Sequence, residues 1–346
     1  MTPILLFIVL ILLSYLSVWI IRRYAEKRQL LDHPNERSSH SLPTPRGGGL
    51  AIVLLVTGTG LFFVRAEDMS RDLVYIVCGI VVAFLGWRDD THSLSPRVRF
   101  AVQGLVAAAS IWGLGYFSSV TIPLFGKLQL GVVGIVITFL WIIGLTNACN
   151  FMDGIDGMAG GVAFAAGLGW VLLTSNISYL ANSFVFWIAL AIAAGSLGFL
   201  GHNWHPAKIF MGDVASTFLG YTFAVLPLMA ANEEGDALML GTLLLWTFIM
   251  DAGVTFIRRA LNRENVFAAH RTHLYQRLVI GGYTHAAVST MYIVLTLVAL
   301  RLASAWGDGS HLASALILFG LPLIYYVLHR HANTINTTGT KGTKDS

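Results

Sequence analysis

Residues 147–161, NACNFMDGIDGMAGG, combine two asparagines and two carboxylates with four glycines. On a helix, Asn150 and Asp153 share one face, and Asp156 follows Asp153 by one turn, so the two carboxylates can converge on one point. The glycines leave the backbone bare, so a phosphate or a metal ion can come close. The simpler alternative is a helix end with asparagine and glycine caps before a solvated loop.

The chain around this stretch is strongly apolar. Of its 346 residues, 55% are hydrophobic and 12% are charged, and the mean hydropathy is +0.70. A soluble domain carries about 25% charged residues, so this composition predicts a polytopic membrane protein. We expect an all-α fold of transmembrane helices. The two cysteines, Cys78 and Cys149, are too few for a disulfide framework or a zinc site.

About eleven apolar segments are long enough to cross a bilayer. They cover residues 3–21, 48–64, 72–87, 100–117, 131–148, 160–175, 183–201, 214–231, 237–257, 285–304 and 311–328. No basic residue precedes the first segment, and Arg22 and Arg23 follow it, so we expect a retained span with its N-terminus outside. This orientation puts four of the 22 Lys and Arg residues outside and the other 18 in the cytoplasm, together with the C-terminus. The outer residues 118–130 alternate apolar and polar side chains, which predicts a short hairpin.

The chain therefore reads as one transmembrane catalytic domain, residues 1–330, with cytoplasmic active-site loops. Residues 331–346 are rich in Thr, Asn and Gly, and we expect a disordered cytoplasmic tail there.

The first two cytoplasmic loops each contain a polar cluster. Residues 32–49 place Arg46 beside a triple glycine that opens the second span, which suits phosphate, although a basic loop lying on anionic lipid has the same composition. Asp89 and Asp90 end the third span. Adjacent carboxylates at a membrane surface can take a proton or help to hold a metal; the alternative is a capped helix end that faces water.

A further cluster, residues 201–216, precedes and opens the eighth span. It contains Asn203 and Lys208, followed by Asp213 at the expected start of the helix. A carboxylate in this position is also a normal helix cap, and on this feature alone the capping role is favoured.

The last cluster follows the ninth span and contains His270, Arg271 and His273. Two histidines three residues apart could bind a metal, but a basic loop without a carboxylate beside them suits a pyrophosphate better. Asp251 lies inside the preceding span, where an ionisable group is costly, so we expect it to pair with an arginine.

Five carboxylates thus lie at the cytoplasmic ends of different spans. They are Asp89, Asp90, Asp153, Asp156 and Asp213. Gathered without a counter-charge they would repel one another, and a divalent cation such as Mg²⁺ relieves this. A metal, cationic clamps and a positioned nucleophile are the equipment of phosphoryl transfer, and at a membrane interface the obvious acceptor is a lipid headgroup. The residues alone predict a magnesium-dependent enzyme that moves a phosphate-bearing group from a nucleotide donor to a membrane lipid.

The order of these motifs resembles the polyprenyl-phosphate N-acetylhexosamine-1-phosphate transferases, which are of glycosyltransferase family 4 type. The matching segments are PNERSSH with PTPRGGG, the Asp89-Asp90 pair, NFMDGIDG, HPAKIFMGD and the HRTH loop, over about residues 30–280. The resemblance implies transfer of a sugar 1-phosphate from a UDP-N-acetylhexosamine to undecaprenyl phosphate, release of UMP and a requirement for Mg²⁺ or Mn²⁺. It also implies a multi-pass protein of the bacterial inner membrane with its active site on the cytoplasmic side.

The same resemblance implies roles for individual side chains. The expected catalytic residues are Asp89, Asp90, Asp153 and Asp156. The expected metal ligands are Asp213, Asn150 and Asp153. The expected substrate-binding residues are Arg46, Asn147, Asn203, Lys208, His270, Arg271 and His273. Asp89 and Asp90 would lie near the lipid phosphate, where Asp89 acts as a general base or only positions that phosphate.

The chain departs from the family pattern at two points. The phospho-N-acetylmuramoyl-pentapeptide transferases carry three consecutive histidines in the last loop, where this chain has HRTHLYQ, and this difference favours the branch that initiates O-antigen. The lysine that many relatives carry shortly after the aspartate pair is missing, and Arg97 or Arg99 is its candidate replacement.

Three other functions share some of these features. The peptidoglycan reaction of the pentapeptide branch is one alternative. A proton- or cation-coupled transporter is another, but it predicts acids near the bilayer midplane and matching broken helices in two repeats. A CDP-alcohol phosphotransferase needs Ala-Arg after Asp-Gly, whereas Asp156 and Gly157 precede Met158.

The expected partners follow from the transferase reading. They are a UDP-N-acetylhexosamine, undecaprenyl phosphate and membrane lipid, with no nucleic acid. A homodimer, the identity of the sugar and the polysaccharide that is initiated stay open.

Overall fold

The computed structural model describes residues 2–32, 42–175, 183–230, 236–266, 268 and 270–342, with side chains as far as residue 336. These ranges form fourteen α-helices, one π-helical segment and two small two-stranded sheets. The elements are α1 (Pro3–Arg28), β1 (Leu31–Asp32), β2 (Thr44–Pro45), α2 (Leu50–Phe62), α3 (Met69–Thr91), α4 (Pro96–Leu114), β3 (Ser119–Ile122), β4 (Gly126–Gln129), α5 (Val133–Phe151), α6 (Met158–Ser175), α7 (Phe184–Asn203), α8 (Asp213–Ala230), α9 (Asp236–Leu244), α10 (Trp246–Leu261), α11 (Leu274–Ile280), α12 (His285–Gly307), α13 (His311–Ala315), η1 (Leu316–Gly320) and α14 (Leu321–Gly342). The prediction of an all-helical membrane protein is confirmed.

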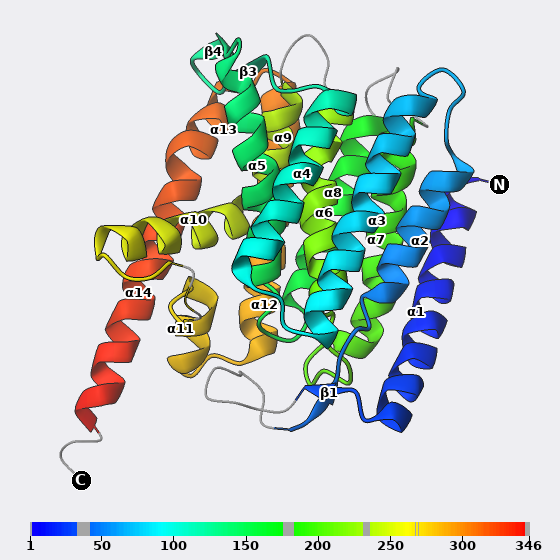
Figure 1. Cartoon of the computed structure of the whole chain (residues 1–346). Coiled ribbons are helices and arrows are strands. Elements are labelled where there is room, and N and C mark those ends of the chain that lie inside the picture. Colours follow the sequence, from blue (N-terminus) through cyan, green and yellow to red (C-terminus); the bar gives the residue numbers. More distant parts are fainter. Residues whose placement is uncertain are drawn as a thin grey trace.

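The long helices run side by side as a bundle, with α6, α7 and α8 most deeply buried inside it (Figure 1). Helix α6 packs on α7, and α8 packs on both α3 and α5. Small residues allow these close contacts: a Cβ atom on Gly167 of α6 would lie 2.9 Å from the backbone nitrogen of Ala193 in α7. A Cβ atom on Gly220 of α8 would lie 2.7 Å from the carbonyl oxygen of Leu145 in α5. Glycine at such positions lets membrane helices approach backbone to backbone.

Eight of the described helices are long and apolar enough to cross a membrane. A ninth span results if the bent pair α9 and α10 is taken as one. Helix α2, with 13 residues, is too short to qualify, and α4 is long enough but too polar in mean hydropathy. Each of the eleven predicted segments corresponds to a helix or a pair of helices, but the count of eleven spans and their orientation stay predictions.

The ninth predicted segment is not a straight helix. Helices α9 and α10 meet at an angle of 81°, and Leu245 separates them with non-helical backbone. Helix α10 therefore turns away from the bundle axis and projects from its side (Figure 1). Its exposed face carries Phe256, Ile257 and Leu261. The apolar run predicted a continuous span because nothing in its composition marks the bend.

The predicted hairpin at residues 118–130 is confirmed: β3 and β4 pair antiparallel, with Ser119 opposite Gln129. The tail differs from the prediction, because α14 continues to Gly342 instead of ending near residue 330. Contacts with α11 account for this difference, since Asn336 donates a hydrogen bond to the Arg277 carbonyl oxygen at 3.0 Å. The last four residues lie outside the described part of the chain.

One end of the bundle collects the polar clusters. The sheet β1–β2 and helix α11 lie at this end, and the β3–β4 hairpin lies at the other (Figure 1). The C-terminal end of α3 and the N-terminal end of α8 meet here as well, because a Cβ atom on Gly86 would lie 2.3 Å from the Asp213 carbonyl oxygen. The predicted cluster of residues 32–49 is described only at Asp32 and from residue 42 onward; its other residues lie outside the described part of the chain.

Candidate active site

Asp90, at the end of α3, joins two other segments of the chain. Its Oδ1 accepts a hydrogen bond from the backbone N–H of Asp213 at 2.9 Å, and its Oδ2 accepts one from Val214 at 3.0 Å. Asp90 therefore caps the N-terminus of α8, where free backbone N–H groups and the helix dipole favour a negative charge. The Arg46 guanidinium lies 2.8 Å from Asp90 Oδ1 and 2.9 Å from Asp213 Oδ1, so it bridges the two carboxylates.

Backbone pairing carries Arg46 to this position. The Phe210 N–H donates to the Pro45 carbonyl oxygen at 2.8 Å, and the Gly48 N–H donates to the Phe210 carbonyl oxygen at 2.9 Å. The segment before α8 thus runs alongside the segment before α2. Burial alone would lower the pKa of Arg46, but Asp213 and Asp90 together raise it above its ordinary value, so Arg46 is a permanent cation.

Asp89 points to a different partner from its neighbour. Its Oδ2 lies 2.8 Å from Arg99 Nη1, and its Oδ1 accepts a hydrogen bond from the Leu94 N–H at 2.7 Å. Ser95 caps α4, followed by Pro96 at the first helical position, and this start places Arg99 on the first turn. Of the two candidate replacements for the missing lysine, Arg99 is the one that forms an ion pair with Asp89.

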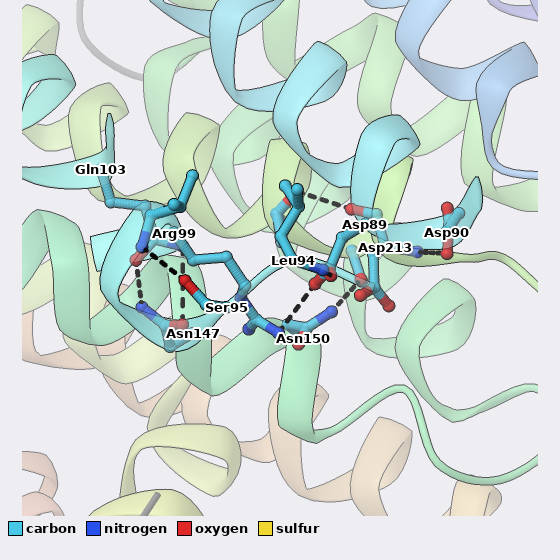
Figure 2. Close-up of polar contacts among 12 residues, drawn as sticks. Asp89, Asp90, Leu94, Ser95, Arg99, Gln103, Asn147, Asn150 and Asp213 are labelled. Atoms are coloured by element: carbon cyan, nitrogen blue, oxygen red, sulfur yellow. Dashed lines mark hydrogen bonds and ion pairs between the residues drawn. The ribbon is translucent and has the colours of Figure 1, made fainter. Parts of the chain in front are cut away.

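Asn150 and Asp153 approach the same carboxylates from the end of α5. Asn150 hydrogen-bonds the side chain of Asp213 and donates to Ser216 Oγ at 3.0 Å (Figure 2). Burial, followed by the charge of Asp213, raises the pKa of Asp153 well above its ordinary value. The predicted metal ligands Asp213, Asn150 and Asp153 are thus brought together.

The donor set of this cluster suits a hard divalent cation. Three carboxylates, Asp90, Asp153 and Asp213, act on one another electrostatically, and Arg46 is the described cation that bridges two of them. When ionised, the three carboxylates outnumber the charge of Arg46, and the ligand atoms are carboxylate and amide oxygens, which Mg²⁺ and Mn²⁺ prefer. Asp153, Asp213 and Asn150 would hold such an ion, which would help to neutralise the charge of a substrate phosphate.

Asp156 has separate partners from Asp153. Its Oδ2 lies 2.7 Å from His205 Nδ1 and 3.4 Å from His285 Nδ1, and it accepts a hydrogen bond from the Ala207 N–H at 3.1 Å. Burial would raise the pKa of Asp156, but the neighbouring His285 and His205 outweigh burial and lower it. The sequence predicted that Asp153 and Asp156 converge on one point, but Asp156 contacts His205, His285 and Ala207 instead. A catalytic role for Asp156 stays a prediction.

Asp156, His205 and His285 form a geometric candidate for a metal site, because their ligand atoms lie within 4.8 Å of one another. Two imidazoles and one carboxylate would suit a transition metal better than Mg²⁺. Two of these ligand atoms already accept backbone hydrogen bonds: Asp156 Oδ2 from Ala207, and His285 Nδ1 from the Asp156 N–H at 3.4 Å. These contacts hold the loop before α8 and the start of α12 against residues 153–157.

Three predicted substrate-binding residues occupy different surroundings. Asn147 donates to Gln103 Oε1 at 2.7 Å and to the Ile143 carbonyl oxygen at 2.8 Å, apart from the carboxylates (Figure 2). Asn203 is buried; it accepts a hydrogen bond from the Gly157 N–H at 3.0 Å and donates to the Ile209 carbonyl oxygen at 2.9 Å, which braces two loops. The Lys208 side chain is exposed.

The loop before α11 lies against the turn that carries Asp153. The Tyr275 hydroxyl donates to the Phe151 carbonyl oxygen at 3.1 Å, and the rings of His273 and Phe151 are 6.1 Å apart. His270 and His273 have ring centroids 4.8 Å apart. Burial, then the charge of His273, lowers the pKa of His270 to about 4, so His270 is neutral at physiological pH.

Asp251 does not pair with an arginine, contrary to the prediction. It is completely buried and accepts hydrogen bonds from the backbone N–H groups of Leu274 and Tyr275, at 2.7 and 3.2 Å, and from the Tyr292 hydroxyl at 2.6 Å. The spacing of Asp251 and Arg258 suggested a partner on the same helix. The same helix contributes only a long hydrogen bond from the Thr255 hydroxyl, at 3.4 Å. The shorter ones come from α11 and α12, which no local pattern indicates.

An apolar pocket of about 430 Å³ lies between α4, α5 and α10. Phe100, Leu140, Phe151, Phe256 and Ile257 line it, and Asn147 is the polar amide among the described residues around it. Phe100 directly follows Arg99 in α4, so one wall of the pocket leads to the Asp89–Arg99 pair. The sequence did not predict this pocket, because no local signal marks the bend before α10, and α10 forms one of its walls. It did not indicate Gln103 as a partner of Asn147 either.

Comparisons with known proteins identify relatives of this chain. The family described as glycosyl transferase family 4 matches residues 73–231. The chain is 31% identical to a probable undecaprenyl-phosphate N-acetylglucosaminyl 1-phosphate transferase of Bacillus subtilis, over 95% of this chain and 92% of that protein. It is 29% identical to an undecaprenyl-phosphate alpha-N-acetylglucosaminyl 1-phosphate transferase of Escherichia coli K12, over 92% of this chain and 87% of that protein. It is 28% identical to a decaprenyl-phosphate N-acetylglucosaminephosphotransferase of Mycobacterium tuberculosis H37Rv, over 85% of this chain and 80% of that protein.

Proposed function

The chain belongs to glycosyl transferase family 4, and from this premise we propose that it transfers a sugar 1-phosphate from a UDP-N-acetylhexosamine to undecaprenyl phosphate. A phosphate oxygen of the lipid attacks the phosphorus bonded to the sugar. The bond between that phosphorus and the bridging oxygen of the diphosphate breaks, and UMP leaves with the electron pair. The product is the sugar linked to the lipid through a diphosphate.

The observation that carries this proposal is the meeting of Asp90, Asp153 and Asp213 around Arg46, beside a pocket fit for a lipid chain. A polyphosphate needs cationic and metal partners, and a prenyl chain needs an apolar groove. Arg99 lies at the point where these two environments adjoin. We place the lipid phosphate near Arg99 and Asp89, with the prenyl chain along Phe100 into the pocket.

The donor belongs on the other side of the carboxylates. His273 and Tyr275 contact Phe151, so their loop lies against the turn that carries Asp153. We assign His270, Arg271 and His273 of this loop to the diphosphate or the sugar. Asp153, Asp213 and Asn150 are assigned to the Mg²⁺ or Mn²⁺ ion. The phosphate monoester of the lipid is already largely ionised at neutral pH, so Asp89 need only keep Arg99 in place.

N-acetylglucosamine is the first sugar to test, because each relative named above is described as handling it. The reaction then starts a cell-surface polysaccharide at the inner face of the bacterial cytoplasmic membrane. The phospho-N-acetylmuramoyl-pentapeptide reaction is the alternative within the family. A transporter is disfavoured, because the acids of the cluster lie at helix ends instead of in the middle of the bundle.

The test uses membranes containing the protein, radiolabelled UDP-sugars and undecaprenyl phosphate. Label should enter the lipid phase with Mg²⁺, stay in the aqueous phase with EDTA, and stay there in Asp213→Ala and Asp153→Ala. UDP-GlcNAc, UDP-GalNAc, 6-deoxy-amino UDP-sugars and UDP-N-acetylmuramoyl-pentapeptide are compared side by side to identify the donor. Full activity in both aspartate variants would refute the metal-site assignment, and no transfer from any donor would refute the proposed reaction.

A further inference from the structure

Asp251 is a completely buried carboxylate outside the cluster around Arg46. It lies in α10, shortly after the 81° break. The Thr255 hydroxyl, one turn further along α10, donates to Asp251 Oδ1 at 3.4 Å, and the shorter hydrogen bonds come from two other helices. The Leu274 and Tyr275 N–H groups begin α11, and the Tyr292 hydroxyl comes from α12. His273 Nδ1 lies 3.4 Å from Asp251 Oδ1 as an additional close neighbour.

This arrangement needs a carboxylate and not merely a polar side chain. Both oxygens are used: Oδ1 accepts from Leu274, and Oδ2 accepts from Tyr275 and Tyr292. An asparagine would turn an NH₂ group toward one of these sets of donors, and a buried donor without an acceptor is costly. Hydrogen bonds to an ionised group are also roughly twice as strong as neutral ones.

The loop that Asp251 holds is continuous with the active site. Arg258, also in α10, donates to the Thr272 carbonyl oxygen at 2.7 Å. Together with the Tyr275 N–H bond to Asp251, this contact ties both ends of residues 272–275 to α10. Tyr275 then fixes the Phe151 carbonyl oxygen, and its hydroxyl fills the space over Gly154, beside Asp153. A shift of α11 would therefore move His270 and Arg271 relative to the metal ligands.

We propose that Asp251 is a positioning residue for the sugar-nucleotide donor: it sets the loop of residues 270–273 and the start of α11 against the turn that carries Asp153. The inference rests on the proposed function in assigning this loop to the donor. Asp251 touches no substrate. It acts through the Leu274 and Tyr275 amides and through His273, as the supporting shell of other sites fixes the groups that contact ligands.

The test compares Asp251→Asn with Asp72→Asn, a matched control. Asp72 is equally buried, but it pairs with Arg65 at the start of α3, at the other end of the bundle from the site. Asp251→Asn should raise KM for the UDP-sugar by about ten- to a hundredfold and leave KM for undecaprenyl phosphate within about twofold. Asp251→Glu, which keeps the charge, should recover part of the loss, and Asp72→Asn should leave both KM values unchanged.

Tyr292→Phe removes one hydrogen-bond donor to Asp251 and leaves the carboxylate in place. This variant tests the positioning role if Asp251→Asn does not fold. A selective rise in donor KM in Tyr292→Phe supports the proposal. Equal changes for both substrates, or no change in Asp251→Asn and Tyr292→Phe, would overturn it. Hydrogen exchange at the Leu274 and Tyr275 amides, faster in Asp251→Asn than in the wild type, reads the loop position without any turnover. If the wild type transfers no sugar, the proposed function fails, while unchanged exchange at these amides would overturn the positioning role independently.

Discussion

Asp90 accepts hydrogen bonds from the backbone of Asp213 and, at the same time, shares Arg46 with the Asp213 side chain. Two segments more than a hundred residues apart in the chain are thus locked together at one end of the bundle. Asp213 can face a metal ion because Asp90 caps the helix that Asp213 begins. Asp90 therefore has a structural role, and Asp213 is the carboxylate of this pair that we assign to the metal ion.

Asp90 and Asp89, although adjacent, should respond differently to the same substitution. Asp90→Asn loses one acceptor at the start of α8 and one partner of Arg46, so transfer should fall by about a hundredfold or more, and the folded state should lose about 0.5–2 kcal/mol. Asp89→Asn breaks only the Arg99 pair and the Leu94 contact, and its thermal midpoint should stay closer to the wild type. Thermal unfolding in detergent and the transfer assay measure both effects. Equal destabilisation by the two variants would contradict the capping role of Asp90.

Gly212 should be intolerant of alanine for two reasons. Its φ is +84°, and a Cβ atom would lie 2.8 Å from Asp90 Oδ2. Gly115 has a φ of +94° and a ψ of −168° with nothing within 4 Å of its Cβ position, so Gly115→Ala reports the backbone cost alone, about 1–3 kcal/mol. Transfer activity should be lost in Gly212→Ala and largely kept in Gly115→Ala. Full activity of Gly212→Ala would show that the Asp90 contact can relax without consequence.

A larger side chain in the apolar pocket should hinder binding of the prenyl chain. Gly253 lines it and has open space at its Cβ position, and leucine is a better helix former than glycine. Gly253→Leu should raise KM for undecaprenyl phosphate by about tenfold without changing KM for the UDP-sugar. Gly58→Leu, in α2 and also with open space at Cβ, is the control. If both KM values are unchanged in Gly253→Leu, the prenyl chain lies elsewhere.

His270 should remain neutral in mildly acidic solution. Its pKa of about 4 in the folded protein lies below the ordinary value of about 6.5, so between these pH values the unfolded chain binds more protons, and stability rises with pH across that window. The Thr272 N–H donates to His270 Nδ1 at 3.3 Å, which leaves the ring proton on Nε2, available to a substrate oxygen. Histidine ¹⁵N NMR spectra, with His270→Gln to identify the signal, should show a neutral Nε2–H ring at pH 6. A charged ring at that pH would contradict this environment.

Much of the site could be predicted because its residues are marked locally. Asp90, Asp153 and Asp213 each stand at the polar end of an apolar run, and the positive-inside rule put all three on one side. The helical spacing expected for Asn150 and Asp153 was wrong, because α5 ends at Phe151 and Asp153 lies in the turn that follows. Gathered carboxylates need a counter-charge, and Arg46 supplies part of it between Asp90 and Asp213.

The remaining features depend on contacts between distant segments. The shortest hydrogen bonds to Asp251 come from α11 and α12, and the histidines beside Asp156 come from the loop before α8 and from α12. Nothing in the spacing of these residues announces the pairings. The 81° break before α10 occurs at Leu245, and no proline marks it in the sequence. The sequence therefore predicted one span where the chain folds as two helices.

The central claim is that Asp213 and Asp153, and not the histidine group around Asp156, hold the divalent cation. Mn²⁺ binding to the purified protein, followed by electron paramagnetic resonance, tests this claim without turnover. Asp213→Asn should weaken Mn²⁺ binding by tenfold or more, as about 10–100-fold is typical even for residues that only support a metal ligand, while His205→Ala should bind Mn²⁺ as the wild type does. Wild-type Mn²⁺ affinity in Asp213→Asn, together with lost affinity in His205→Ala, would contradict the account.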